Sequence, residues 1–142
     1  MLIKPIHPNF KLPVRSTELA AGYDIYMPEA GSLTPGAERG VAVPLGFSAA
    51  VPEGYAAFLL PRSGAGAKKG ISLNNTVGVI DSDYRGEWIA NLRVRDGAPV
   101  SWEAGDRIIQ VVLVKVGTPD LTLTDELPST ERGEGGFGHT GQ

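Results

Sequence analysis

A glycine-rich segment at the C-terminus carries the chemical groups that a phosphorylated nucleoside would need. Residues 131–142 contain five glycines together with Arg132, Phe137 and Thr140. Because ordering glycine costs much conformational freedom, we expect this segment to form no helix or strand and to be mobile when unbound. Its backbone N–H groups and guanidinium could bind phosphate, and its aromatic ring could cover a base. The segment predicts an arm that orders over a nucleoside phosphate; the alternative is an unstructured tail.

Two other short segments place polar groups where strands are expected to end. Asp81 follows the apolar Val79 and Ile80 and precedes Tyr84. A carboxylate at a strand end can orient and deprotonate water, whereas the alternative is an acidic hairpin turn. Arg62 stands between Pro61 and a short helical pattern, with a hydroxyl and a glycine after it. This arrangement predicts an anion site, and its alternative is a simple helix cap after a proline turn.

Two polar residues interrupt otherwise apolar strands. Asp24 is the one acid in the run Gly22-Tyr23-Asp24-Ile25. Buried acids are rare without a partner, so we expect Asp24 to meet an arginine or a hydrated cation. Gln110 is the one amide in an apolar strand. It is either a ligand-binding group or a core polar residue whose hydrogen bonds are satisfied internally.

The composition limits the classes of protein that fit. The chain has 142 residues, 42% of them hydrophobic and 20% charged, which fits one domain with a sizeable core. The net charge of −3 argues against a nucleic-acid surface, so an anionic ligand would need local arginines, lysines or a metal ion. There is no cysteine and there are two histidines, which excludes disulfides and argues against a zinc centre. No signal-peptide core or membrane-spanning apolar run is recognisable, so we expect a cytoplasmic protein.

Short apolar runs separated by turn signals predict an all-β fold, a barrel or jelly-roll-like arrangement with a detachable tail. The 19 glycines and 11 prolines suit many short strands. Strands are expected at residues 23–27, 41–43, 47–51, 55–60, 71–73, 77–80, 88–94 and 106–116. A helix is expected only at 63–69, capped by Ser63 and stopped by Gly70. The Asn74-Asn75 pair suggests a tight hairpin or bulge.

The strand expected at residues 106–116 is apolar on both faces. Ile109 and Val111 alternate with Val112 and Val114. A strand that is buried on both sides in a small all-β chain predicts a subunit interface as well as a core.

Five segments, at residues 21–25, 61–64, 78–87, 105–110 and 132–141, resemble in order and spacing the five motifs of the trimeric deoxyuridine triphosphatases (dUTPases). The resemblance implies one domain over residues 1–142, a distorted jelly-roll-like β-barrel with a flexible glycine-rich arm at 131–142. It implies cleavage of dUTP to dUMP and diphosphate, which supplies dUMP and keeps uracil out of DNA.

The resemblance also assigns roles to individual residues. Asp81 matches the general base that activates the attacking water, and Tyr84 the ring that lies against the deoxyribose and excludes a 2′-hydroxyl. The remaining substrate-binding matches are Asn75, Gly78, Val79 and Ile80 (uracil slot), Ile89 (backbone contact), Arg62, Ser63, Gly64 and Gln110 (phosphates), Phe137 (lid over uracil), and Arg132, Gly138, His139 and Thr140 (clamp on the outer phosphates).

The resemblance finally implies the partners and the metal. Mg²⁺ is held by the phosphates, and Asp24 touches it only through water. The chain is expected to be a homotrimer with shared active sites, dUTP as its small-molecule substrate, and no nucleic-acid or membrane partner. Two alternatives remain: a dCTP deaminase on the same fold, and a non-catalytic regulatory or scaffold protein. Intact matches at Asp81, Tyr84 and the arm favour the hydrolase.

Overall fold

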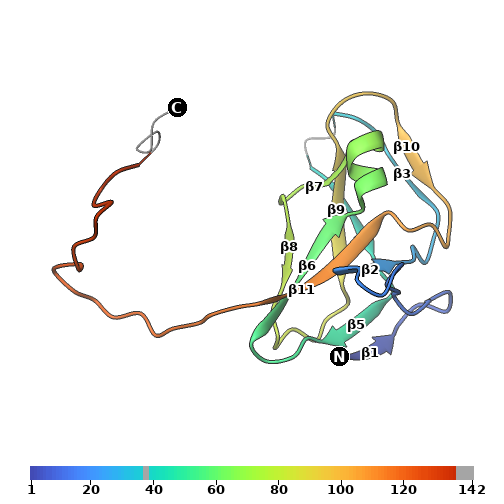
Figure 1. Cartoon of the computed structure of the whole chain (residues 1–142). Coiled ribbons are helices and arrows are strands. Elements are labelled where there is room, and N and C mark those ends of the chain that lie inside the picture. The colour runs from blue at the N-terminus through green and yellow to red at the C-terminus, as the bar shows by residue number, and fades with distance from the viewer. Residues whose placement is uncertain (37–38, 137–142) are drawn as a thin grey trace.

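The computed structural model describes residues 1–36 and 39–136, and these residues form eleven strands and one short helix (Figure 1). All strand pairs are antiparallel. A four-stranded sheet has the order β2 (Gly22–Ile25), β11 (Ile109–Lys115), β6 (Tyr55–Pro61), β8 (Gly78–Ile80), and a three-stranded sheet the order β4 (Val41–Pro44), β9 (Ile89–Val94), β7 (Ile71–Leu73). Two pairs complete the fold: β1 (Leu2–Pro5) with β5 (Phe47–Ala50), and β3 (Gly31–Leu33) with β10 (Val100–Trp102). The prediction of a fold made mostly of strands is confirmed.

The core forms where the inward faces of these sheets meet. In β9 and the residue before it, Trp88, Ala90, Leu92 and Val94 are all buried, so the alternating pattern read from the sequence is correct. Trp88 packs on Phe47 with the ring centroids 5.0 Å apart. Burial of each large side chain of this kind contributes about 1.5–3 kcal/mol, so the cluster accounts for much of the stability of the fold.

The predicted short helix exists but begins differently from the prediction. It is a π-helix at Gly64–Lys68, and Ser63 makes no side-chain hydrogen bond to its start. The backbone of Ser63 is already helical, with φ −52° and ψ −43°, whereas a capping residue needs an extended backbone. The expected cap is therefore wrong. Gly70 does end the helix: its φ is +67°, and its N–H reaches the carbonyl of Gly66 at 3.1 Å.

The Asn74-Asn75 pair lies in a tight turn, as expected, but the turn does not join a hairpin. Thr76 has a positive φ of 69°, and its N–H donates to the carbonyl of Leu73 at 3.1 Å. The strands on either side belong to different sheets, since β7 pairs with β9 and β8 pairs with β6. The turn therefore moves the chain from one sheet to the other.

Strand β11 is the centre of the four-stranded sheet, between β2 and β6. Ile109 and Val111 are fully buried, while Val112 and Val114 on the opposite face are only partly buried. The chain then leaves the sheets, and residues 117–136 contain no helix or strand and extend away from the rest of the molecule (Figure 1). Leu121 and Leu123 are almost completely exposed there. No helix within the described residues is long and apolar enough to cross a membrane.

Candidate active site

A pocket of about 170 Å³ lies beside the end of β8 and brings together five of the predicted site residues. Its walls are Val79, Ile80, Asp81, Tyr84 and Ile89, together with Glu87. Val79 is 52% exposed and Ile89 47% exposed. Large apolar side chains gathered around a carboxylate on the surface are typical of a binding site for a ligand with a flat, partly apolar face.

Tyr84 is fixed within this pocket. Its hydroxyl donates to the carbonyl of Glu87 at 3.1 Å, and its own N–H donates to the carbonyl of Asp81 at 3.2 Å. The ring lies so close to Gly86 that a Cβ at that position would overlap the phenol. Glycine at position 86 therefore allows the ring to lie this close to the backbone. The hydrogen bond from the Tyr84 hydroxyl to the Glu87 carbonyl holds the ring in this position.

A second cluster is centred on Asp24, whose side chain is only 9% exposed. One carboxylate oxygen contacts Nε of Arg62 at 2.8 Å, and the other contacts Nη1 of Arg107 at 3.4 Å. The hydroxyl of Ser16 also donates to Asp24, at 2.8 Å. The expectation that this buried acid meets an arginine is confirmed. Arg107 and Ser16 were not predicted, because nothing in their local sequence distinguishes them from exposed polar residues.

These contacts hold Arg62 in one orientation. Its Nη1 donates to the carbonyl of Arg107 at 2.9 Å, and its backbone N–H donates to the carbonyl of Ile108 at 2.9 Å. Ser63 and Gly64 follow it and are exposed. A fixed guanidinium beside exposed backbone at the start of a helix is suited to binding an anion.

Gln110 lies in the same region, because the sheet register places it opposite Asp24 on β2 and opposite Leu60 on β6. Its Nε2 donates to the carbonyl of Pro61 at 3.2 Å. Its Oε1 would lie 2.5 Å from a Cβ at Gly22, so the glycine leaves room for the amide in this position. The structure therefore gives the Nε2 of this amide an internal acceptor, on the residue that precedes Arg62.

The two clusters lie at opposite ends of β6. Ile80 pairs with Ala57, so Asp81 follows on the side of Ala56, whereas Arg62 lies just beyond the other end of the strand. The separation from Ala56 to Arg62 is roughly 20 Å at about 3.3 Å per strand residue. A single chain does not bring Asp81 and Arg62 together.

The arm residues are placed only in part. Arg132 is exposed, and its Nε donates to the carbonyl of Gly135 at 2.8 Å within a local turn. In Figure 1 this part of the chain lies far from both clusters. The predicted positions Phe137, Gly138, His139 and Thr140 lie outside the described residues.

Within the described residues there is no group of three or more His, Asp or Glu side chains that could hold a metal ion directly. Both oxygens of Asp24 already contact cationic or hydroxyl donors. Direct coordination there would compete with two guanidinium groups, whereas a hydrated ion could still use a remaining lone pair through its water. Asp24 therefore fits Mg²⁺ only as an indirect contact.

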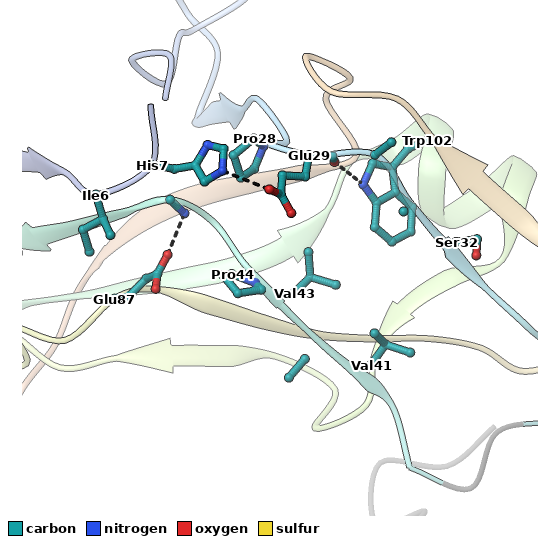
Figure 2. Close-up of a pocket in the computed structure, with 14 residues that line it drawn as sticks. Ile6, His7, Pro28, Glu29, Ser32, Val41, Val43, Pro44, Glu87 and Trp102 are labelled. Atoms are coloured by element: carbon teal, nitrogen blue, oxygen red, sulfur yellow. Dashed lines mark hydrogen bonds and ion pairs between the residues drawn. The ribbon is translucent and has the colours of Figure 1, made fainter. Parts of the chain in front are cut away.

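A larger cavity, about 440 Å³, lies elsewhere and is drawn in Figure 2. None of the predicted site residues that the structure describes lines it. His7 and Glu29 point toward one another across its upper side, 3.1 Å apart, and the indole N–H of Trp102 donates to the carbonyl of Glu29. Glu87 lines this cavity as well as the smaller pocket with Asp81.

Antiparallel sheets that carry a carboxylate–tyrosine pocket and an anchored arginine are features of a small β-fold enzyme that acts on an anionic substrate. The family model described as dUTPase matches residues 8–141, and the chain belongs to this family. The deoxyuridine 5′-triphosphate nucleotidohydrolase of Actinobacillus pleuropneumoniae serotype 3 is 43% identical over 135 residues, which cover 94% of this chain and 89% of that protein. The corresponding protein of Dictyoglomus turgidum is 42% identical and covers 99% of this chain and 97% of its own length.

Solved structures agree with this assignment. The dUTPase of Staphylococcus bacteriophage 80alpha, in a structure with dUpNHpp, superposes with a TM-score of 0.90 at 28% identity over 99% of this chain and 98% of that one. A variant dUTPase from phage phi11 of S. aureus, described as coordinating a structural Mg(II) ion, has a TM-score of 0.77 at 24% identity over 88% of this chain and supports the fold alone. The resemblance read from the five sequence segments is confirmed.

Proposed function

We infer that this chain hydrolyses dUTP to dUMP and diphosphate, which supplies dUMP and removes a precursor of uracil in DNA. The observation that carries this conclusion is the dUTPase family match over residues 8–141, with 42–43% identity to relatives along almost their whole length. The pocket that gathers Asp81 and Tyr84 supplies the chemistry for this reaction.

In the proposed reaction Asp81 is the general base. Its carboxylate is exposed at the edge of the pocket, where it can accept a proton from a water that attacks the α-phosphorus. The bond from that phosphorus to the bridging oxygen breaks, and diphosphate leaves. Tyr84 lies against the deoxyribose, and its fixed ring leaves no room for a 2′-hydroxyl.

The proposed uracil slot uses the backbone between Asn75 and Asp81. Strand β8 is at the edge of its sheet, so one side of its backbone has no strand partner within the described residues. Unpaired N–H and C=O groups at such an edge can imitate the pairing groups of a complementary base. Gly78, Val79 and Ile80 form this strand, and Ile89 closes the pocket beside them.

The proposed phosphate site is the second cluster. Arg62 keeps one terminal nitrogen, Nη2, free of hydrogen bonds within the described residues, while its other nitrogens bind Asp24 and Arg107. Ser63 and Gly64 offer exposed groups beside it, and Gln110 lies adjacent. Arg132, Phe137, Gly138, His139 and Thr140 of the arm are proposed to close over the base and the outer phosphates.

We propose that the active form is a homotrimer with shared sites, each subunit a single jelly-roll-like barrel with an arm at residues 131–142. Two observations support this. The base cluster and the phosphate cluster lie roughly 20 Å apart on one chain, at about 3.3 Å per residue of β6, so different subunits would have to supply them. The tail extends away from its own subunit, so it could contact a neighbour. It also exposes two large apolar side chains, Leu121 and Leu123, that such a contact could cover.

Mg²⁺, when bound through the phosphates, would neutralise part of the triphosphate charge, which an acidic chain cannot do alone. Asp24 would contact it only through water. The residues of this chain would still bind the base, orient the phosphates and take the proton at Asp81.

The test is diphosphate release with Mg²⁺ across dUTP, dCTP, dTTP and UTP. We expect strong preference for dUTP. Ammonia from dCTP would instead identify a deaminase, and nucleotide binding without turnover would identify a regulatory protein on this fold.

A further inference from the structure

Glu87 connects the pocket that holds Asp81 to a distant part of the fold. Its side chain is half-buried and lines that pocket. One carboxylate oxygen accepts the backbone N–H of Gly46 at 3.1 Å, the contact drawn as a dashed line in Figure 2. The general base and the phosphate ligands proposed above do not include this residue.

Gly46 is itself held firmly. Its carbonyl accepts the N–H groups of Ile6 at 2.8 Å and His7 at 3.0 Å. Its φ is +78°, and a Cβ there would lie 2.8 Å from the Cβ of His7, so only glycine fits. The amide that Glu87 accepts is therefore a fixed anchor rather than part of a mobile loop.

The backbone of Glu87 faces the other way, toward Tyr84. Its carbonyl accepts the Tyr84 hydroxyl at 3.1 Å. The following residue, Trp88, donates to the carbonyl of Phe47 at 2.9 Å and accepts the N–H of Leu45 at 2.8 Å. The side chain of Glu87 and the backbone of Trp88 therefore bind the same segment of the chain, residues 45–47.

We propose that Glu87 is a positioning residue for sugar selection: by its bond to Gly46 it fixes the carbonyl that holds the Tyr84 hydroxyl, and so fixes the ring. The inference rests on the proposed function, because the ring selects a sugar only if Tyr84 faces the deoxyribose. Steric rejection of a 2′-hydroxyl needs a ring that cannot retreat. A ring held only by its own side-chain rotamer would yield to a slightly larger substrate.

The test compares Glu87→Gln with Glu87→Ala and measures kcat and KM for dUTP and for UTP by diphosphate release. Glutamine keeps an oxygen that can accept the Gly46 N–H, so we expect its dUTP-to-UTP ratio of kcat/KM to stay near that of the unaltered chain. Alanine removes the acceptor, and we expect this ratio to fall about tenfold, the size expected for one lost hydrogen bond to a charged group. The matched control is Glu103→Ala, since the Glu103 side chain is exposed and makes no hydrogen bond within the described residues.

A second variant keeps the proposal testable if Glu87→Ala does not fold. Tyr84→Phe retains the ring and removes only the hydroxyl that Glu87 holds, so the ratio should fall here too. The double variant Tyr84→Phe with Glu87→Ala should have no lower dUTP-to-UTP ratio of kcat/KM than either single variant, because both changes break the same series of contacts. Additive losses, an unchanged ratio in Tyr84→Phe, or a ratio lost equally in Glu87→Gln would overturn the inference.

Failure of the inference differs from failure of the proposed function. An unaltered chain that releases no diphosphate from dUTP would refute the function. An unaltered chain that prefers dUTP, together with a folded Glu87→Ala variant that prefers it equally, would refute the positioning role alone.

Discussion

Replacing Asp24 by asparagine would test whether the buried carboxylate holds Arg62 for phosphate binding. The substitution keeps the shape of the side chain but removes its charge. An amide can offer its oxygen to only one side, so if it accepts from Arg62 it must turn its NH₂ group toward Arg107 and Ser16. The Ser16 hydroxyl can rotate to accept a hydrogen bond, but the Arg107 guanidinium cannot.

The magnitude follows from how exposed each partner is. The Asp24–Arg62 contact at 2.8 Å is a charged hydrogen bond, a class that contributes about 1.5–3 kcal/mol. The Arg107 contact is longer, at 3.4 Å, and its side chain is 36% exposed, so solvent reduces its contribution to about 0–1 kcal/mol. Asparagine retains one hydrogen bond, from the charged Arg62 to its neutral amide oxygen, and relieves part of the cost of burying a carboxylate charge. We therefore expect a net loss of about 2 kcal/mol in the free energy of unfolding.

The assay pairs thermal unfolding with steady-state kinetics. A loss of this size lowers the midpoint temperature by roughly 4–8 °C for a chain of this length. The KM for dUTP should rise several-fold, because Arg62 loses the contact that orients it. Asp120→Asn is the matched control: Asp120 is exposed in the tail and makes no hydrogen bond within the described residues, so the midpoint should not move. An Asp24→Asn variant with the midpoint and KM of the unaltered chain would show that Asp24 does not position Arg62.

The proposed base, assembly and arm can each be tested separately. Asp81→Asn should retain binding of a non-hydrolysable dUTP analogue but lose roughly 10²–10⁴-fold in kcat, and near-normal diphosphate release would remove Asp81 as the base. Light scattering should give the mass of a trimer; a monomer with full activity would contradict the shared site. Deleting residues 132–142 should leave a folded trimer with poor turnover, as measured by gel filtration and diphosphate release. Full activity after the deletion would show that the segment is an unstructured tail with no role in catalysis.

Most of the sheet structure could be predicted from the sequence because its strands carry a local signal. The alternation from Trp88 to Val94 and the apolar run around Val111 stand out without any tertiary information. Strands β1, β3 and β10 were missed. Each has only three or four residues and pairs with a distant segment, as Val100 does with Leu33. So short a strand shows no reliable periodicity, and the equally short β7 and β8 were predicted because they flank the Asn74-Asn75 turn signal.

The candidate site likewise contains residues that the sequence identifies and residues that only the fold brings together. Asp24 could be identified as a residue needing a cationic partner, because an acid between apolar residues is costly to bury alone. Which arginine it meets depends on the register of β2 with β11, which no local pattern encodes. Glu87 was missed for a related reason. Its importance lies in a contact with Gly46, 41 residues away, and its local sequence resembles an ordinary exposed turn.

If the site is shared between subunits, as proposed, the length of β6 links assembly to activity in this chain. The pocket with Asp81 lies beside one end of this strand and Arg62 follows its other end, and its hydrogen bonds to β8 and β11 keep the two ends apart. Under the proposed function, the nucleotide would therefore need one of these two clusters from a different subunit. A second copy that places its Arg62 beside the Asp81 of the first would complete a site without moving either sheet. On this view the rigid sheet needs no large motion for catalysis.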